Sequence, residues 1–534
     1  MAATKSTLPT GDEVRVEALS VVGRRPECFS STIKECLFVL TATMSIGMSS
    51  FLYGLCTVIT APIAKDLGMT SAEITWIGAS SALCSGSFLL FFAKIADTFG
   101  RRGLLIFSMA AFAISALITG FATNPLYLDV FCGLLGLWSA ASVPPAIGIL
   151  GAAYDVPSKR KNWAFACFSA GNPVGYVMGC IFSGVATDLF NWRASFYLLA
   201  IIYAVFFVAA LWTVPKIQHD TVGLTWESLK RFDLFGIALS MVGLAFFCAS
   251  LTIAGDAPKG WSTPYIIALL IVGLALLFGF VGWEKICKYP VMPLRIWRDR
   301  NFSWINIVVL LGFTPFSASV FWLSLYLQNV LNYSTLSVAV HLLPQAIAGI
   351  LVNILAGAIL HRVNNKLLVM IGAMSYFGAM LLFATMRYGE QSEKERYWSR
   401  LFPALVLSVI GADLQFNVAN MYVLSSLPSH QQSLAGGIFN TITKVGTAVG
   451  LGITTSIYNA AGTSGQALQR TWRPYELVFW FCVGCSGLGV LCVPFLTITT
   501  QGGKESREQS SHGNSEEDKA GMVVGLDVLT DKRS

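Results

Sequence analysis

Charge is what this sequence has least of. Only 12% of its 534 residues are charged, about half of the roughly 25% found in a typical soluble domain. Hydrophobic residues make up 54%, and the mean hydropathy is +0.63. This balance excludes an ordinary soluble globular protein. Apolar runs of 18 or more residues recur along the chain, and about 20 such residues are enough for a helix to cross a bilayer. We therefore expect an all-α integral membrane protein.

Several functional signatures are also missing. There is no G-x-x-x-x-G-K-[ST] phosphate loop, which argues against ATP-driven transport. The five histidines are scattered without metal-ligand spacing, and most of the twelve cysteines lie inside apolar runs, where a thiol acts as a small hydrophobe. The net charge of +7 is explained by basic loops beside a membrane. We expect no cofactor, no metal, no ATP, no nucleic-acid partner and no enzymatic activity.

The apolar runs predict fourteen transmembrane spans. They cover residues 35–60, 73–94, 103–122, 127–151, 163–185, 194–214, 234–255, 264–283, 303–326, 336–360, 366–386, 400–426, 433–458 and 475–497.

The basic residues predict the orientation of these spans. With the N-terminus inside, 26 of the 36 Lys and Arg residues fall in inner segments and 9 in outer ones, while Lys444 falls within a span. Basic residues concentrate on the cytosolic side of membrane proteins, so both termini are predicted to be cytosolic. We expect a multi-pass protein of the plasma membrane, with the vacuolar membrane as the alternative.

One inner loop combines an acid with two arginines. In "AKIADTFGRRGLL", Asp97 ends the second span, and Arg101 and Arg102 begin the third after Gly100. An acid adds little to a topology signal. We interpret the loop as a cytosolic gate, in which opposite charges bond across the turn and to nearby helix ends. The alternative is a plain positive-inside stop.

A weaker copy of this loop follows the tenth span. In "GAILHRVNNKLLV", His361 stands in the place of Asp97 and Lys366 in the place of Arg102. If the last six spans repeat the first six, residues 35–214 form an N-terminal six-helix bundle and residues 303–497 a C-terminal one.

The rest of the chain follows from this division. Residues 215–302 are then a linker with two extra transmembrane helices. Residues 1–34 form a cytosolic N-tail, and residues 498–534 form a cytosolic C-tail that we expect to be disordered because it is poor in apolar residues.

These features resemble the major facilitator superfamily. Asp97, Gly100, Arg101 and Arg102 match its loop signature G-x-L-a-D-r-x-G-r-r, and "NWRASFYL" and "SLAGGIFNTITKVGTAVGLGI" add to the likeness. With fourteen spans, the chain is similar to the fungal branch of drug/proton antiporters. The resemblance implies two pseudo-symmetric bundles and a gating role for the loop. It also implies a small-molecule substrate, a proton gradient as the energy source and a monomer in the lipid bilayer.

The twelfth span carries a polar stripe. Asp413, Asn417 and Asn420 follow an i, i+4, i+7 spacing and share one helix face. Asp413 lies near the middle of the span, where an ionisable group is costly and indicates function. We interpret it as the group that binds the proton or cation, with the asparagines binding substrate. The alternative is a buried structural network between helices.

Other spans offer further candidate cavity residues. Lys444 lies at mid-span and is expected to pair with Asp413 or to serve the site. Asn172, followed by a proline, and Trp138 are predicted to line the cavity. The resemblance also implies an arginine in the fourth span, where this chain has Cys132. If protons are coupled to transport, Asp413 is therefore the better carrier.

Two further patterns concern packing and modification. Three glycines of the fifth span and two of the thirteenth are spaced by four, which is typical of closely packed membrane helices. They are Gly171, Gly175, Gly179, Gly446 and Gly450. Asn332 lies in a glycosylation pattern, "NYS", close to the membrane.

Taken with the resemblance, the sequence predicts a secondary transporter that exports a small organic toxin, drug or secondary metabolite against proton entry. Two alternatives remain open at this point. One is a carrier of a small inorganic or cationic solute such as ammonium, or an uptake carrier. The other is a transporter-like nutrient sensor, although a sensor needs a signalling surface and these tails are short.

Overall fold

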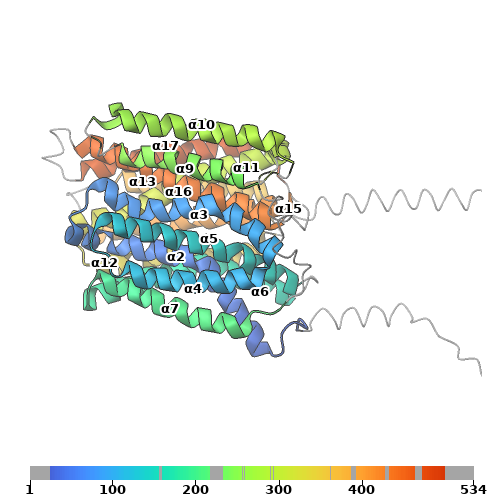
Figure 1. Ribbon diagram of the computed structural model, residues 1–534. Helices are drawn as coiled ribbons and strands as arrows, with labels where there is room; N and C mark the ends of the chain where they lie inside the picture. The colour runs from blue at the N-terminus through green and yellow to red at the C-terminus, as the bar shows by residue number, and fades with distance from the viewer. Residues whose placement is uncertain are drawn as a thin grey trace, which may run out of the picture.

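Long helices run side by side through the whole molecule (Figure 1). The computed structural model describes residues 25–154, 159–216, 233–254, 257, 259–288, 290, 292, 294–360, 363–386, 393–426, 432–462 and 472–498. Within these ranges the chain forms helices and no strands. Most of the predicted N-tail and of the predicted disordered C-tail lies outside them.

Fourteen long helices are present in the described ranges. They are α2 (Thr32–Leu67), α3 (Ser71–Phe99), α4 (Arg101–Thr119), α5 (Pro125–Ala153), α6 (Lys159–Leu189), α7 (Trp192–Thr213), α9 (Leu234–Ile253), α10 (Pro264–Ile286), α11 (Arg300–Asn329), α12 (Thr335–Ile359), α13 (Asn365–Ala384), α15 (Phe402–Ser425), α16 (Gln432–Gly462) and α17 (Arg473–Cys492). A short helix, α14 (Glu393–Arg396), and one π-helical turn precede α15.

Each predicted span falls on one of these helices, which confirms the all-α membrane class. By length and composition, twelve described helices are apolar enough to cross a membrane. Helices α3 and α16, the other two long helices, meet where the two bundles contact each other. They pack against each other in the interior, where the Thr455 hydroxyl donates to Thr75 Oγ1 at 2.8 Å. Their polar residues therefore face protein and not lipid.

Helices α2 to α7 pack together as an N-terminal bundle, and α11 to α17 as a C-terminal bundle. Within the first bundle, α2 and α6 approach so closely that side chains would not fit. A Cβ atom at Gly171 would overlap the carbonyl oxygen of Thr43, and one at Gly179 would overlap that of Phe51. At Gly175 it would lie 2.5 Å from the carbonyl oxygen of Gly47.

The two extra helices lie against the seam between the bundles. Leu244 and Cys248 of α9 pack with Leu83 of α3 and Ala448 of α16. Helix α10 covers α9 at the edge of the molecule (Figure 1). Both extra helices thus sit outside the two bundles and not between them.

Because the helices alternate in direction, α2 begins and α17 ends on the same side, which we call the terminal side. The opposite side is the far side. On the terminal side, a buried acid of α2 joins the first bundle: Arg160 donates to Glu35 Oε2 at 2.7 Å, and the Tyr154 hydroxyl donates to Oε1 at 2.8 Å. Burial and this bond raise the pKa of Tyr154 above its usual range. Glu35 thereby ties α2 to the ends of α5 and α6.

Candidate functional site

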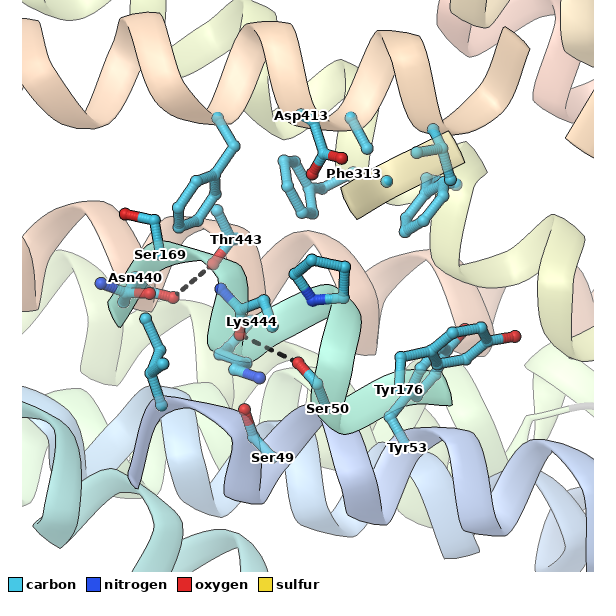
Figure 2. A pocket seen from close by; sticks show the side chains of 18 of the residues that line it. Ser49, Ser50, Tyr53, Ser169, Tyr176, Phe313, Asp413, Asn440, Thr443 and Lys444 are labelled. Atoms are coloured by element: carbon cyan, nitrogen blue, oxygen red, sulfur yellow. Dashed lines mark hydrogen bonds between the residues drawn. The ribbon is translucent and has the colours of Figure 1, made fainter. Parts of the chain in front are cut away.

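A central cavity of about 180 Å³ lies between the two bundles. Its N-terminal wall is rich in small hydroxyl groups, and its C-terminal wall carries aromatic and ionisable side chains. The lining residues include Ser49, Ser50, Tyr53, Ser85, Ser139, Ser169, Asn172, Tyr176, Phe313, Phe316, Gln345, Asn353, Asp413, Phe416, Asn440, Thr443 and Lys444. Figure 2 shows Asp413 on one wall and Ser49 and Ser50 of α2 on the opposite wall.

Asp413 lies at the middle of α15 and lines this cavity. Its Oδ2 atom is buried without a hydrogen-bond partner. The neighbouring Asn417 side chain donates to Asn353 Oδ1 at 2.9 Å and to the Asp413 carbonyl oxygen at 2.8 Å, while Asn353 donates to Gly349. Asn417 therefore supports the cavity wall through Asn353. Neither Asn417 nor Asn420 is among the residues that line the cavity, which corrects the prediction that these two asparagines bind substrate there.

Lys444 lines the central cavity and also an adjoining chamber of about 130 Å³. Residues of α2 share both spaces with it, namely Ser49, Ser50 and Tyr53. The expected ion pair with Asp413 is absent among the described contacts, and no hydrogen bond to the Lys444 ammonium group is recorded there. The two groups stand on different helices, α16 and α15, and their side chains do not meet. The cavity therefore holds one acid and one base that leave each other unpaired.

Asn172 lies on the N-terminal wall, as its predicted role requires, and accepts a hydrogen bond from Ser50 at 2.9 Å. Trp138 does not line the cavity, which corrects the prediction for that residue. Its indole nitrogen donates to Ser115 of α4 at 3.0 Å, and its ring lies edge-on to Phe107. These contacts hold the side chain between α4 and α5, on the face of α5 turned away from the cavity.

Hydrogen bonds between the bundles close the far side of the cavity. The Tyr53 hydroxyl donates to the Ser317 carbonyl oxygen at 2.8 Å, and the Ser324 hydroxyl donates to that of Thr57. The bond between Thr455 and Thr75 lies at the same end of the molecule. A ligand in the cavity is thus sealed from the far side by groups of α2, α3, α11 and α16.

The charged loop forms the turn between α3 and α4. Gly100 has a φ of 109°, which a residue with a side chain rarely adopts. Arg101 donates to the Gly148 carbonyl oxygen of α5 at 2.8 Å, and Arg102 to that of Leu211, next to the end of α7, at 3.2 Å. These bonds stay within the N-terminal bundle. The side chains of Asp97 and His361 lie outside the described part of the chain.

The remaining predicted residues lie at helix contacts and at a turn. A Cβ atom at Gly450 would lie 2.5 Å from the Thr314 carbonyl oxygen of α11, whereas one at Gly446 would make ordinary contacts of 3.4 Å. Asn332 follows α11 with a φ of 56°, a left-handed conformation that asparagine tolerates.

Sequence reasoning missed Gln345 and Asn353, both of which line the cavity from α12. Gln345 Oε1 is buried without a hydrogen-bond partner. A signal was available, since a Gln and an Asn eight residues apart share one face of an apolar helix. Tyr53 was also missed, because a tyrosine inside an apolar run has no pattern of its own.

Comparisons with known proteins agree with this architecture. The sequence model of the Major Facilitator Superfamily matches residues 37–451. An efflux pump of Aspergillus terreus, terJ, is 26% identical over 482 residues, covering 89% of this chain and 90% of the pump. A low affinity ammonium transporter of Saccharomyces cerevisiae is 25% identical over 432 residues, covering 80% of this chain and 82% of that protein. A solved peptide transporter shares the fold at a TM-score of 0.61 with 14% identity, covering 87% of this chain and 96% of that structure.

Proposed function

Because the chain belongs to the Major Facilitator Superfamily and is a membrane transporter rather than an enzyme, we propose that it exports a small organic toxin, drug or secondary metabolite by alternating access, driven by proton entry. Asp413 is the proton carrier. The observation that carries this proposal is the Asp413 carboxylate at mid-helix, facing a cavity between the bundles, with one oxygen buried and unpaired.

The position of Asp413 suits a group that couples substrate transport to proton entry. Only a group that gains or loses charge as the cavity changes sides can draw on a proton gradient, because the gradient must bias one conformation over the other. A buried carboxylate without a counter-charge is costly when ionised, and protonation relieves that cost. The fourth span offers Cys132, fully buried, where the resemblance implies an arginine. Asp413 is the acid that lines the central cavity, and we assign the coupling to it.

The size and lining of the cavity favour an organic substrate. The cavity, at about 180 Å³, is more than tenfold larger than the roughly 10–15 Å³ that holds one water molecule, which is close in size to an ammonium ion. Phe313, Phe316 and Phe416 give it apolar aromatic surface. The efflux pump among the relatives supports this choice, whereas the ammonium transporter supports the alternative.

Transport by inverted vesicles tests the proposal. Vesicles carrying the full chain should accumulate an organic member of a mixed panel when their interior is made acidic, and the accumulation should collapse when the pH gradient is dissipated. Vesicles without the protein are the control. Accumulation of ammonium alone, or of organic compounds at the same level without a gradient, would contradict proton-coupled export.

A further inference from the structure

The two charges of the central cavity do not neutralise each other. Asp413 Oδ2 is buried and unpaired. The Lys444 side chain lines the same cavity and forms no ion pair with the described residues. Burying an unpaired charge costs several kcal/mol, so such groups usually find a counter-charge. Here the protein supplies none, and a ligand is left to provide it.

The wall around Asp413 accepts hydrogen bonds. Gln345 Oε1, from α12, is buried without a partner and lines the same cavity. Together with the carboxylate of Asp413, it offers two unfilled acceptors. Such a wall favours a ligand group that donates hydrogen bonds and carries positive charge, as an ammonium group does.

The wall around Lys444 donates hydrogen bonds. Ser49 and Ser50 line both chambers with Lys444. Since Ser50 donates to Asn172 Oδ1, the amide N–H groups of Asn172 are left to donate to a ligand. An ammonium group, an amide and the Ser49 hydroxyl together favour an anionic oxygen group such as a carboxylate.

We propose that the transported molecule is amphoteric, with a carboxylate bound at Lys444 and an ammonium group bound at Asp413. The inference rests on the proposed function and names its substrate class. It also explains exchange for protons, because the ammonium group and a proton compete for the same carboxylate and cannot both occupy it. A simple cation would satisfy Asp413 but leave Lys444 uncompensated.

A ligand series that separates the two ends tests this inference. The probes are the ω-amino acids glycine, 4-aminobutanoate and 6-aminohexanoate, with hexylamine and hexanoate as compounds of one charge. Their binding to the purified full chain is measured by thermal stabilisation and by displacement. We expect one of the ω-amino acids to bind about 10-fold or more tightly than either singly charged compound, since each charge-assisted contact contributes about this factor. Because the three amino acids differ in length, the test does not require the distance between Asp413 and Lys444 to be known.

Two variants test which residue binds which charged group of the ligand. Lys444→Met should remove the advantage of the amino acid over hexylamine, and Asp413→Asn should remove its advantage over hexanoate. A melting curve without ligand shows whether each variant is folded. The comparison of the five probes on the wild-type protein does not depend on either variant. Equal binding of all five probes, or an amino-acid preference that survives Lys444→Met, overturns the inference. Loss of proton-driven transport with the preference intact overturns only the proposed function.

Discussion

The contact between α2 and α6 makes a quantitative prediction for Gly175. An alanine there would place its Cβ 2.5 Å from the Gly47 carbonyl oxygen and 2.9 Å from its Cα. An ordinary carbon–oxygen contact is about 3.3–3.6 Å, so the two backbones would have to separate by about 1 Å. Overpacking of this kind costs about 1–3 kcal/mol.

A matched control is available in α17. Nothing lies within 4 Å of a Cβ atom built at Gly484, so an alanine there has open space. Alanine is the better helix former by about 1 kcal/mol, and Gly484→Ala should be neutral or stabilising. Because this gain applies equally to Gly175→Ala, the two variants should differ by the overpacking cost of about 1–3 kcal/mol. At about 2–4 °C per kcal/mol, Gly175→Ala should melt at least about 2 °C below Gly484→Ala.

Buried thiols provide the assay. Cys56, Cys132 and Cys180 are buried in the N-terminal bundle, and a thiol-reactive dye reaches them only on unfolding. Melting curves of the purified variants in one detergent, followed with such a dye, give the comparison directly. If Gly175→Ala melts at or above Gly484→Ala, the close approach of α2 and α6 is not what the structure describes.

Three further predictions concern gating and orientation. Tyr53→Phe removes the hydrogen bond to Ser317 and should weaken the closure of the far side by about 1 kcal/mol. A membrane-impermeant thiol reagent added on that side should then label a cysteine introduced at Phe316 about fivefold faster than in the protein that keeps Tyr53. An unchanged labelling rate would contradict this prediction. Asp97→Asn should strongly reduce transport at near-normal abundance, measured in vesicles with matched protein levels, whereas full activity would reduce the loop to a topology signal. Tags at both termini should be reached by antibody only after permeabilisation, and labelling of either tag in intact cells would refute the orientation.

Hydropathy and charge were sufficient to predict the helices. All fourteen predicted spans fall on long helices of the described chain, α3 and α16 included. An apolar run of this length has few other folds available in lipid, because every backbone polar group must be bonded within its own segment. The mid-span position of Asp413 likewise follows from counting residues along α15.

Side-chain direction was harder to predict, because it depends on how each helix is rotated against its neighbours. Trp138 lies on α5, which does line the cavity, yet its ring faces α4 and bonds Ser115. The expected pair of Asp413 and Lys444 fails for the same reason, since similar depth on two helices does not set the angle between side chains. Gln345 was missed because its exposure to the cavity depends on the packing of α12 against the other bundle.

The central claim is that Asp413 couples transport to the proton gradient, and Asp413→Asn in reconstituted vesicles tests it most directly. An asparagine keeps the size and hydrogen-bonding character of the side chain but cannot change charge. With a pH gradient imposed, the variant should still exchange substrate across the membrane at equal concentrations, yet it should fail to move substrate uphill. Uphill transport by Asp413→Asn at the wild-type level would contradict the account and leave Asp413 as a structural group of the cavity wall.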